Sequence, residues 1–183
     1  MIPAPADRGP QRRRRRLAHV AAIVLRWIEP EDNPSGVVYG TLAVGAVLAA
    51  ESTRRETFAD TVIATLLVLT LYWVAHTYAT VVGRRLTTRQ SLSARGLWEA
   101  LVHEAAILKG AALPIAVLGA LWGAGVSLDT AVVAALWTSA LALTLFEIVA
   151  TVRSHGTGAQ RALQILLGMA LGGGILLVRA VLH

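Results

Sequence analysis

LWEALVHEAAILKGAALPIAVLGALWGAG, residues 97–125, decides the class of fold. A helix crosses the hydrocarbon core of a bilayer with about 20 mostly apolar residues, so this stretch is long enough to span. It nevertheless carries four ionisable side chains in its first half and a proline near its centre: Glu99, His103, Glu104, Lys109 and Pro114. Ionisable groups are costly inside a membrane span, so each of them is a candidate functional residue.

The composition of the whole chain agrees with a membrane protein. Of 183 residues, 55% are hydrophobic and only 15% are charged, and the mean hydropathy is +0.60. A soluble domain carries about 25% charged residues. The chain has no cysteine, which excludes disulfides and thiolate metal sites. Lys109 is the only lysine beside many arginines, a bias that indicates a GC-rich and bacterial coding sequence.

The N-terminal segment 1–16 is predicted to be a disordered, arginine-rich arm. Three prolines and a glycine precede five consecutive arginines: Arg12, Arg13, Arg14, Arg15 and Arg16. Such a run can bind nucleic acid, but beside apolar segments it is more typical of contact with anionic lipid headgroups on the cytoplasmic side. We therefore expect no nucleic acid partner.

Segment 17–35 is predicted to be an interfacial helix with a linker. Its apolar part, 17–28, is too short to span and resembles a signal-peptide core, but Arg26 interrupts it and no typical cleavage site follows. An amphipathic helix on the inner surface, with Trp27 at headgroup level, fits better. Whether 17–28 instead joins a span stays open.

The remainder, 36–183, is predicted to be an all-α transmembrane domain, so the fold class is a polytopic helix bundle. Five spans are expected, at 36–52, 58–82, 97–125, 128–152 and 162–182, and Ser127 is expected to cap the fourth. Arginines concentrate in 1–35, 83–96 and 153–161 rather than in the alternate connections. This bias predicts a multi-pass protein of the cell membrane with its N-terminus in the cytoplasm and its C-terminus outside.

Counting residues along straight spans predicts one layer of ionisable groups in the inner half of the membrane. The layer would contain His76, Glu99, His103, Glu104, Lys109 and Glu147. One interpretation is a water-filled pathway that relays protons or binds a cation. The other is structural pairing, with Lys109 held by Glu147 or Glu104, because an unpaired charge is costly in lipid.

Enzymatic and metal chemistry have little support in the sequence. Glu99, His103 and His76 could supply three metal ligands, but their spacing matches neither di-iron bundles nor zinc proteases. No phosphate-binding loop or nucleophile motif occurs. We therefore predict no catalytic residues, no metal, no cofactor and no enzyme activity.

Two further features concern packing. Pro114 deprives the carbonyl of Gly110 of its helical donor, which produces either an ion-binding carbonyl at mid-membrane or merely a tolerated kink. The small-residue repeats at 119–123 and 168–172 match the close-packing motif of membrane helices. Since five spans barely enclose a polar space, we expect a homo-oligomer packed on these glycine faces.

The functional prediction follows from the lack of any large loop. Without a loop large enough to form a soluble catalytic or ligand-binding domain, the function must reside in the helix bundle or in the N-terminal arm. We predict a small proton or cation channel or transporter that uses the inner-half layer. The alternative is a membrane scaffold or regulatory subunit in which the same charges only pair.

Overall fold

The computed structural model describes residues 33–50, 57–88, 91, 93–153 and 157–182, and within these ranges every regular element is a helix. In chain order the helices are α2 (Pro34–Ala50), α3 (Phe58–Thr88), α4 (Ala94–Glu104), α5 (Ala106–Gly123), α6 (Leu128–Arg153) and α7 (Gly158–Leu182). The predicted all-α class is confirmed. The predicted arm 1–16 and surface helix 17–28 lie outside the described residues.

The helix boundaries differ from the prediction in two places. α3 continues to Thr88, so Arg84 and Arg85 belong to its last turns rather than to a loop. The stretch 97–125, predicted as one span, is divided into α4 and α5 at Ala105. The other predicted spans agree with α2, α6 and α7 to within a few residues.

A short polar residue stands just before most of these helices. Its side chain can accept hydrogen bonds from the first backbone amides, which have no partner within the helix. Asn33 caps α2, where its Oδ1 accepts from the amide of Gly36 at 2.8 Å, and Pro34 occupies the first helical position. The hydroxyl of Ser127 accepts from the amide of Thr130 at 3.4 Å, which confirms the predicted cap of α6.

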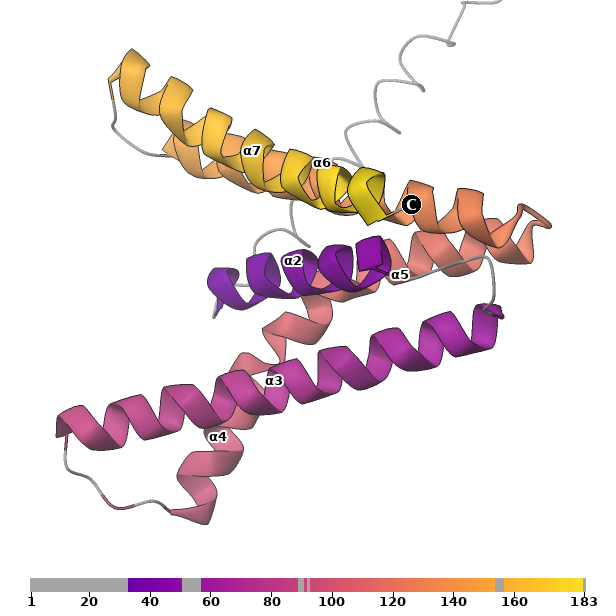
Figure 1. The fold of residues 1–183 in the computed structure, drawn as a ribbon. Helices are drawn as coiled ribbons and strands as arrows, with labels where there is room; N and C mark the ends of the chain where they lie inside the picture. Colours follow the sequence, from indigo (N-terminus) through magenta and orange to yellow (C-terminus); the bar gives the residue numbers. More distant parts are fainter. Residues whose placement is uncertain (1–32, 51–56, 89–90, 92, 154–156, 183) are drawn as a thin grey trace, which may run out of the picture.

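The shortest helix, α2, lies at the centre of the bundle. α6 and α7 form a hairpin on one side of it, α5 packs along it, and α3 lies on the opposite side from the hairpin (Figure 1). α4 turns away from the axis of α5 and runs toward the far end of α3 (Figure 1). The centre of the fold is therefore a helix of only 17 residues.

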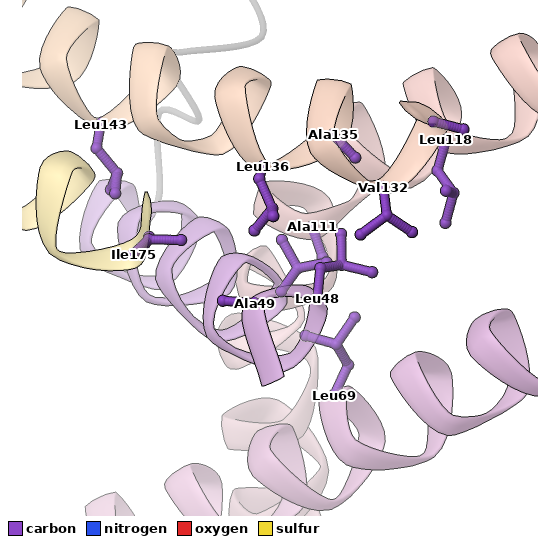
Figure 2. Close-up of a cluster of buried hydrophobic side chains, with 12 residues drawn as sticks. Leu48, Ala49, Leu69, Ala111, Leu118, Val132, Ala135, Leu136, Leu143 and Ile175 are labelled. Carbon is purple, nitrogen blue, oxygen red and sulfur yellow. The ribbon is translucent and has the colours of Figure 1, made fainter. Parts of the chain in front are cut away.

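The apolar core joins α2 to its neighbours (Figure 2). Leu48 of α2, Leu69 of α3 and Leu136 of α6 are at most 1% exposed and belong to this cluster. Burying a leucine of this kind contributes about 1.5–3 kcal/mol in water, and in lipid the same contacts act through close packing. The cluster therefore joins five helices, α2, α3, α5, α6 and α7.

Small residues let α2 and α5 approach until their backbones touch. A Cβ atom at Gly40 would overlap the carbonyl of Ile107, and one at Gly110 would overlap the carbonyl of Val37. This close approach is the geometry expected of small-residue repeats in membranes, where helix association depends on van der Waals packing.

The outward faces of the helices are apolar. Leu67, Leu71 and Leu141 are 64–70% exposed, together with many other large hydrophobic side chains. Four helical stretches are long and apolar enough to cross a membrane, and the shorter α2 is equally apolar. The chain therefore has the build of a multi-pass membrane protein, with lipid as the surrounding solvent.

Candidate functional site

The centre of the candidate site is the helix break at Ala105. In a continuous helix the amide of Ala105 would donate to the carbonyl of Leu101, four residues back. It donates instead to Val102, at 3.2 Å, and the next turn begins with Leu108 donating to Ala105 at 3.0 Å. α4 and α5 therefore meet at an angle, and the end of α4 presents free carbonyls.

A side chain of α3 and the cap residue of α2 donate hydrogen bonds to those carbonyls. Trp73 of α3 donates its indole N–H to the carbonyl of Leu101 at 3.1 Å. The amide Nδ2 of Asn33 donates to the carbonyl of His103 at 3.2 Å. Because a buried, unsatisfied carbonyl costs about 1–3 kcal/mol, these two contacts make the break energetically acceptable. Neighbouring helices thus hold the break in place.

The carbonyl that Pro114 frees is satisfied in the same way. The hydroxyl of Thr41 on α2 donates to the carbonyl of Gly110 at 3.1 Å and also lies 3.0 Å from the carbonyl of Val37 in its own helix. Thr41 and Gly110 are both buried. Of the two interpretations of Pro114, the packed kink therefore fits the geometry better than an open ion-binding carbonyl.

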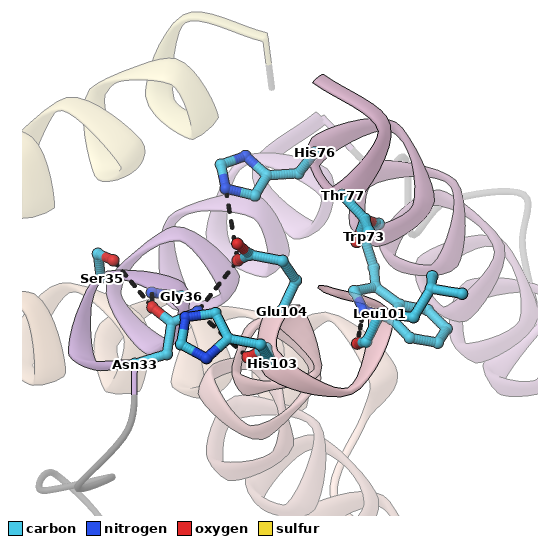
Figure 3. Close-up of polar contacts among 9 residues, drawn as sticks. All are labelled: Asn33, Ser35, Gly36, Trp73, His76, Thr77, Leu101, His103 and Glu104. Carbon is cyan, nitrogen blue, oxygen red and sulfur yellow. Dashed lines mark hydrogen bonds and ion pairs between the residues drawn. The ribbon is translucent and has the colours of Figure 1, made fainter. Parts of the chain in front are cut away.

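Glu104, the last residue of α4, points into the bundle and is 6% exposed. Its Oε2 accepts from Nδ2 of Asn33 at 3.0 Å and lies 3.6 Å from Nε2 of His76 (Figure 3). Asn33 thus caps α2 and binds the end of α4 at the same time. Three helices meet at one carboxylate.

His76 sits beside two tyrosine rings. Its ring centroid lies 5.2 Å from that of Tyr39 on α2 and 6.0 Å from that of Tyr72 on α3. The imidazole is 28% exposed, whereas the Glu104 side chain is 8% exposed. The histidine therefore lies between the buried carboxylate and the outside of the bundle.

This arrangement suits proton binding better than metal binding. The carboxylate of Glu104 and the imidazole of His76, 3.6 Å apart, form an ion pair when the imidazole is protonated. Among the described residues there is no group of three or more His, Asp or Glu side chains that could hold a metal ion. The amide of Asn33 fixes one oxygen of the carboxylate.

Four of the six predicted site residues are not part of this cluster. Glu99 is exposed and pairs with Arg95 on the same helix at 3.0 Å, and the side chains of His103 and Lys109 are also exposed. Glu147 packs its methylene groups against Gly168 of α7. The predicted pairing of Lys109 with Glu104 or Glu147 does not occur in the part of the chain that the structure describes. The single layer predicted from straight spans is therefore replaced by one pair, His76 and Glu104.

Three members of the cluster were missed by sequence reasoning. Asn33, followed by Pro34, carries the pattern of a helix cap, which could have identified the start of α2 and hence the polar end of that helix. Tyr39 and Tyr72 have no such signal, because aromatic residues in spans usually serve packing. Their position beside His76 depends on the orientation of α2 and α3 about their own axes, which the sequence does not give.

Comparison of the chain with family models, with curated proteins and with solved structures found no match to any of the three. The contacts around Glu104 are therefore what supports a function for this membrane protein.

Proposed function

We propose that the protein is a proton-responsive integral membrane protein, a small proton or cation channel or transporter, in which His76 and Glu104 form the proton-binding pair. One observation carries the proposal: a buried carboxylate, shared by three helices, lies 3.6 Å from a partly exposed imidazole. Ionisable groups buried among apolar helices are costly and commonly mark a functional site.

The charges around the pair explain why a proton matters there. The carboxylate has a neutral amide donor on one side and a histidine on the other, so its negative charge is compensated only when the histidine carries a proton or when the carboxyl group itself does. An uncompensated buried charge is costly, so uptake of one proton stabilises the contact between α2, α3 and α4. Gain or loss of that proton can then change how these helices pack.

The proposed location is the cytoplasmic membrane of a bacterium. The arginine-rich segments favour an N-terminus in the cytoplasm and a C-terminus outside. The end of α3, which contains Arg84 and Arg85, and the start of α7, which contains Arg161, lie at one end of the bundle (Figure 1). This arrangement favours a single cytoplasmic side. Anionic lipid headgroups would bind the arm with Arg12 to Arg16.

The second candidate is a membrane scaffold or regulatory subunit. The observation that favours it is the role of Asn33, Trp73 and Thr41, which satisfy helix-break carbonyls and leave the breaks firmly packed. In that case the pair of His76 and Glu104 only ties helices together, and the N-terminal arm recruits partners.

Flux through reconstituted protein separates the two candidates. Purified protein in liposomes, with an internal pH dye and an imposed potential, should move protons or a cation, and the rate should change across pH 5–8. His76→Ala and Glu104→Gln should reduce the flux to a small fraction while the helical content is kept. His103→Ala is the matched control, because that imidazole is exposed, and it should conduct like the wild type.

Two results would decide against transport. One is a wild-type protein that moves no proton and no cation at any pH in this range. The other is equal loss of flux in His76→Ala and His103→Ala, because the structure pairs His76 with Glu104 and leaves the His103 side chain exposed. Loss of thermal stability in His76→Ala without any wild-type flux would support the scaffold.

A further inference from the structure

We propose that α4 and the last turns of α3 lie outside the hydrocarbon core and form a docking surface for anionic phospholipid headgroups. We call residues 83–88 and 94–103 the α3–α4 corner. The proposal concerns different residues from the N-terminal arm and does not depend on proton transport. It follows from the lengths of the helices and from the contacts that fix their relative levels.

One contact shows that the start of α3 and the end of α5 lie at the same depth in the membrane. Phe58, the first residue of α3, stacks on Trp122 near the end of α5, with 4.0 Å between ring centroids and 6° between planes. Thr57 and Asp60 beside Phe58 exchange hydrogen bonds and are exposed. Polar caps and tryptophan are typical of a membrane–water boundary.

The opposite boundary lies where α5 begins. The 18 residues of α5 span about 27 Å, close to the roughly 30 Å of hydrocarbon. His76 lies 18 residues after Phe58, so it is also about 27 Å from that level. The contact between His76 and Glu104 confirms that the two helices reach this level together.

α2 reaches its own end at the same level. Asn33, its cap, contacts Glu104, and a Cβ atom at Gly36 would come within 2.9 Å of that of Ala106. The sequence immediately before Asn33 reads Glu29-Pro30-Glu31-Asp32, which is too polar for hydrocarbon. The cluster around Glu104 therefore marks the boundary of the core.

The last turns of α3 lie beyond that boundary, and α4 lies at it, because Trp73 of α3 reaches the carbonyl of Leu101. α3 has 31 residues, or about 46 Å, so roughly its last 12 residues extend past the core. Arg84 and Arg85 on this extension are exposed, and Leu86 is 78% exposed. α4 starts at the same end and is inclined to α5 (Figure 1).

α4 has the character of an interfacial helix. Arg95 and Glu99 pair on one exposed side, and Trp98 and Val102, which are 67% and 57% exposed, lie on the adjoining side, about 60° around the helix axis. Such a helix places tryptophan and valine at the acyl boundary and its charges in water. Because Arg95 is paired with Glu99 on α4, Arg84 and Arg85 are the positive groups available to lipid phosphates, which attract arginines near an anionic surface.

Site-directed nitroxide labels test the level of α4 on this cysteine-free chain. Single cysteines replace Trp98, Val102 and Leu113, the full chain is reconstituted in phosphatidylcholine with or without phosphatidylglycerol, and collision with oxygen and with a water-soluble nickel complex gives the depth. The labels at 98 and 102 should lie at headgroup depth. The label at 113, which is seven residues and about 10 Å into α5 from Ala106, should lie deeper than both. Labels at 98 and 102 buried in the core would overturn the proposal.

The lipid class is tested by the response of the label at 102 to phosphatidylglycerol. We expect added phosphatidylglycerol to reduce its collision with the nickel complex, and Arg84→Gln with Arg85→Gln to abolish that change. Arg161→Gln, at the same end of the bundle but on α7, should keep it. No change with phosphatidylglycerol, or an unchanged response in the double variant, would refute recognition of anionic headgroups.

Discussion

The hydroxyl of Thr41 on α2 donates to the carbonyl of Gly110 on α5, the carbonyl that Pro114 leaves without a backbone donor. Replacing Thr41 by valine keeps the shape and removes the donor. We expect the free energy of unfolding to fall by about 1–2 kcal/mol, because the carbonyl is buried in a place without water. Reversible unfolding in mixed micelles measures it.

Two further variants make this first prediction specific. Thr65→Val is the matched control, since Thr65 is buried and its hydroxyl bonds only to Thr61 of its own helix. Pro114→Ala restores a backbone donor to Gly110, so Thr41→Val should cost clearly less in that background. Equal costs with proline and with alanine at 114 would show that the hydroxyl does not serve the freed carbonyl.

The second prediction concerns the backbone contact between α2 and α5. Gly40→Ala and Gly110→Ala should each lower the free energy of unfolding by about 1–3 kcal/mol, since the added methyl group pushes against a carbonyl of the facing helix. Gly119→Ala is the control, because that position faces open space. There the higher helix propensity of alanine should raise stability by up to about 1 kcal/mol. A neutral Gly40→Ala would contradict the close approach.

The third prediction separates assembly from folding. Gly172 is buried against Ala140 of α6, whereas Gly123 at the end of α5 faces open space. If copies of the chain associate through α5, Gly123→Leu should shift the species seen by native mass spectrometry without loss of helical content. Gly172→Leu should instead destabilise the single chain, because it separates α7 from α6. A wild-type protein that is monomeric by native mass spectrometry would contradict the predicted homo-oligomer.

The fourth prediction is the orientation in the membrane. Single cysteines at Thr87 and Thr157 should react only with reagents on the cytoplasmic side, and one at Ser127 only with reagents outside. All three positions are exposed, so access rather than burial decides the result. Reaction of Thr87 and Ser127 from the same side would contradict five crossings of the bilayer.

Much of the fold was accessible from the sequence because apolar length is a strong signal. The ends of α6 fell within a residue of the prediction, and Ser127 was recognised as its cap. The break at Ala105 gave no such signal. Ala105 and Ala106 are good helix formers, and the break depends on Trp73 and Asn33, which are distant in sequence.

The site was only partly accessible for a related reason. Glu99 and His103 are four residues apart and therefore share one face of a helix, but the spacing could not tell that this face points outward. Glu104, one residue further, turns about 100° around the axis and enters the bundle. Which of two neighbouring charges is buried depends on the rotation of the helix, and that is fixed by contacts with α2 and α3.

The central position of α2 also has a consequence for biogenesis. α2 precedes all the other described helices in the chain, yet α5, α6 and α7, which surround it, are synthesised much later. The helix must therefore wait in the bilayer with its glycine face in contact with lipid until those helices have been inserted. Insertion and assembly are then separate stages, and the final core closes only after the C-terminal hairpin has left the ribosome.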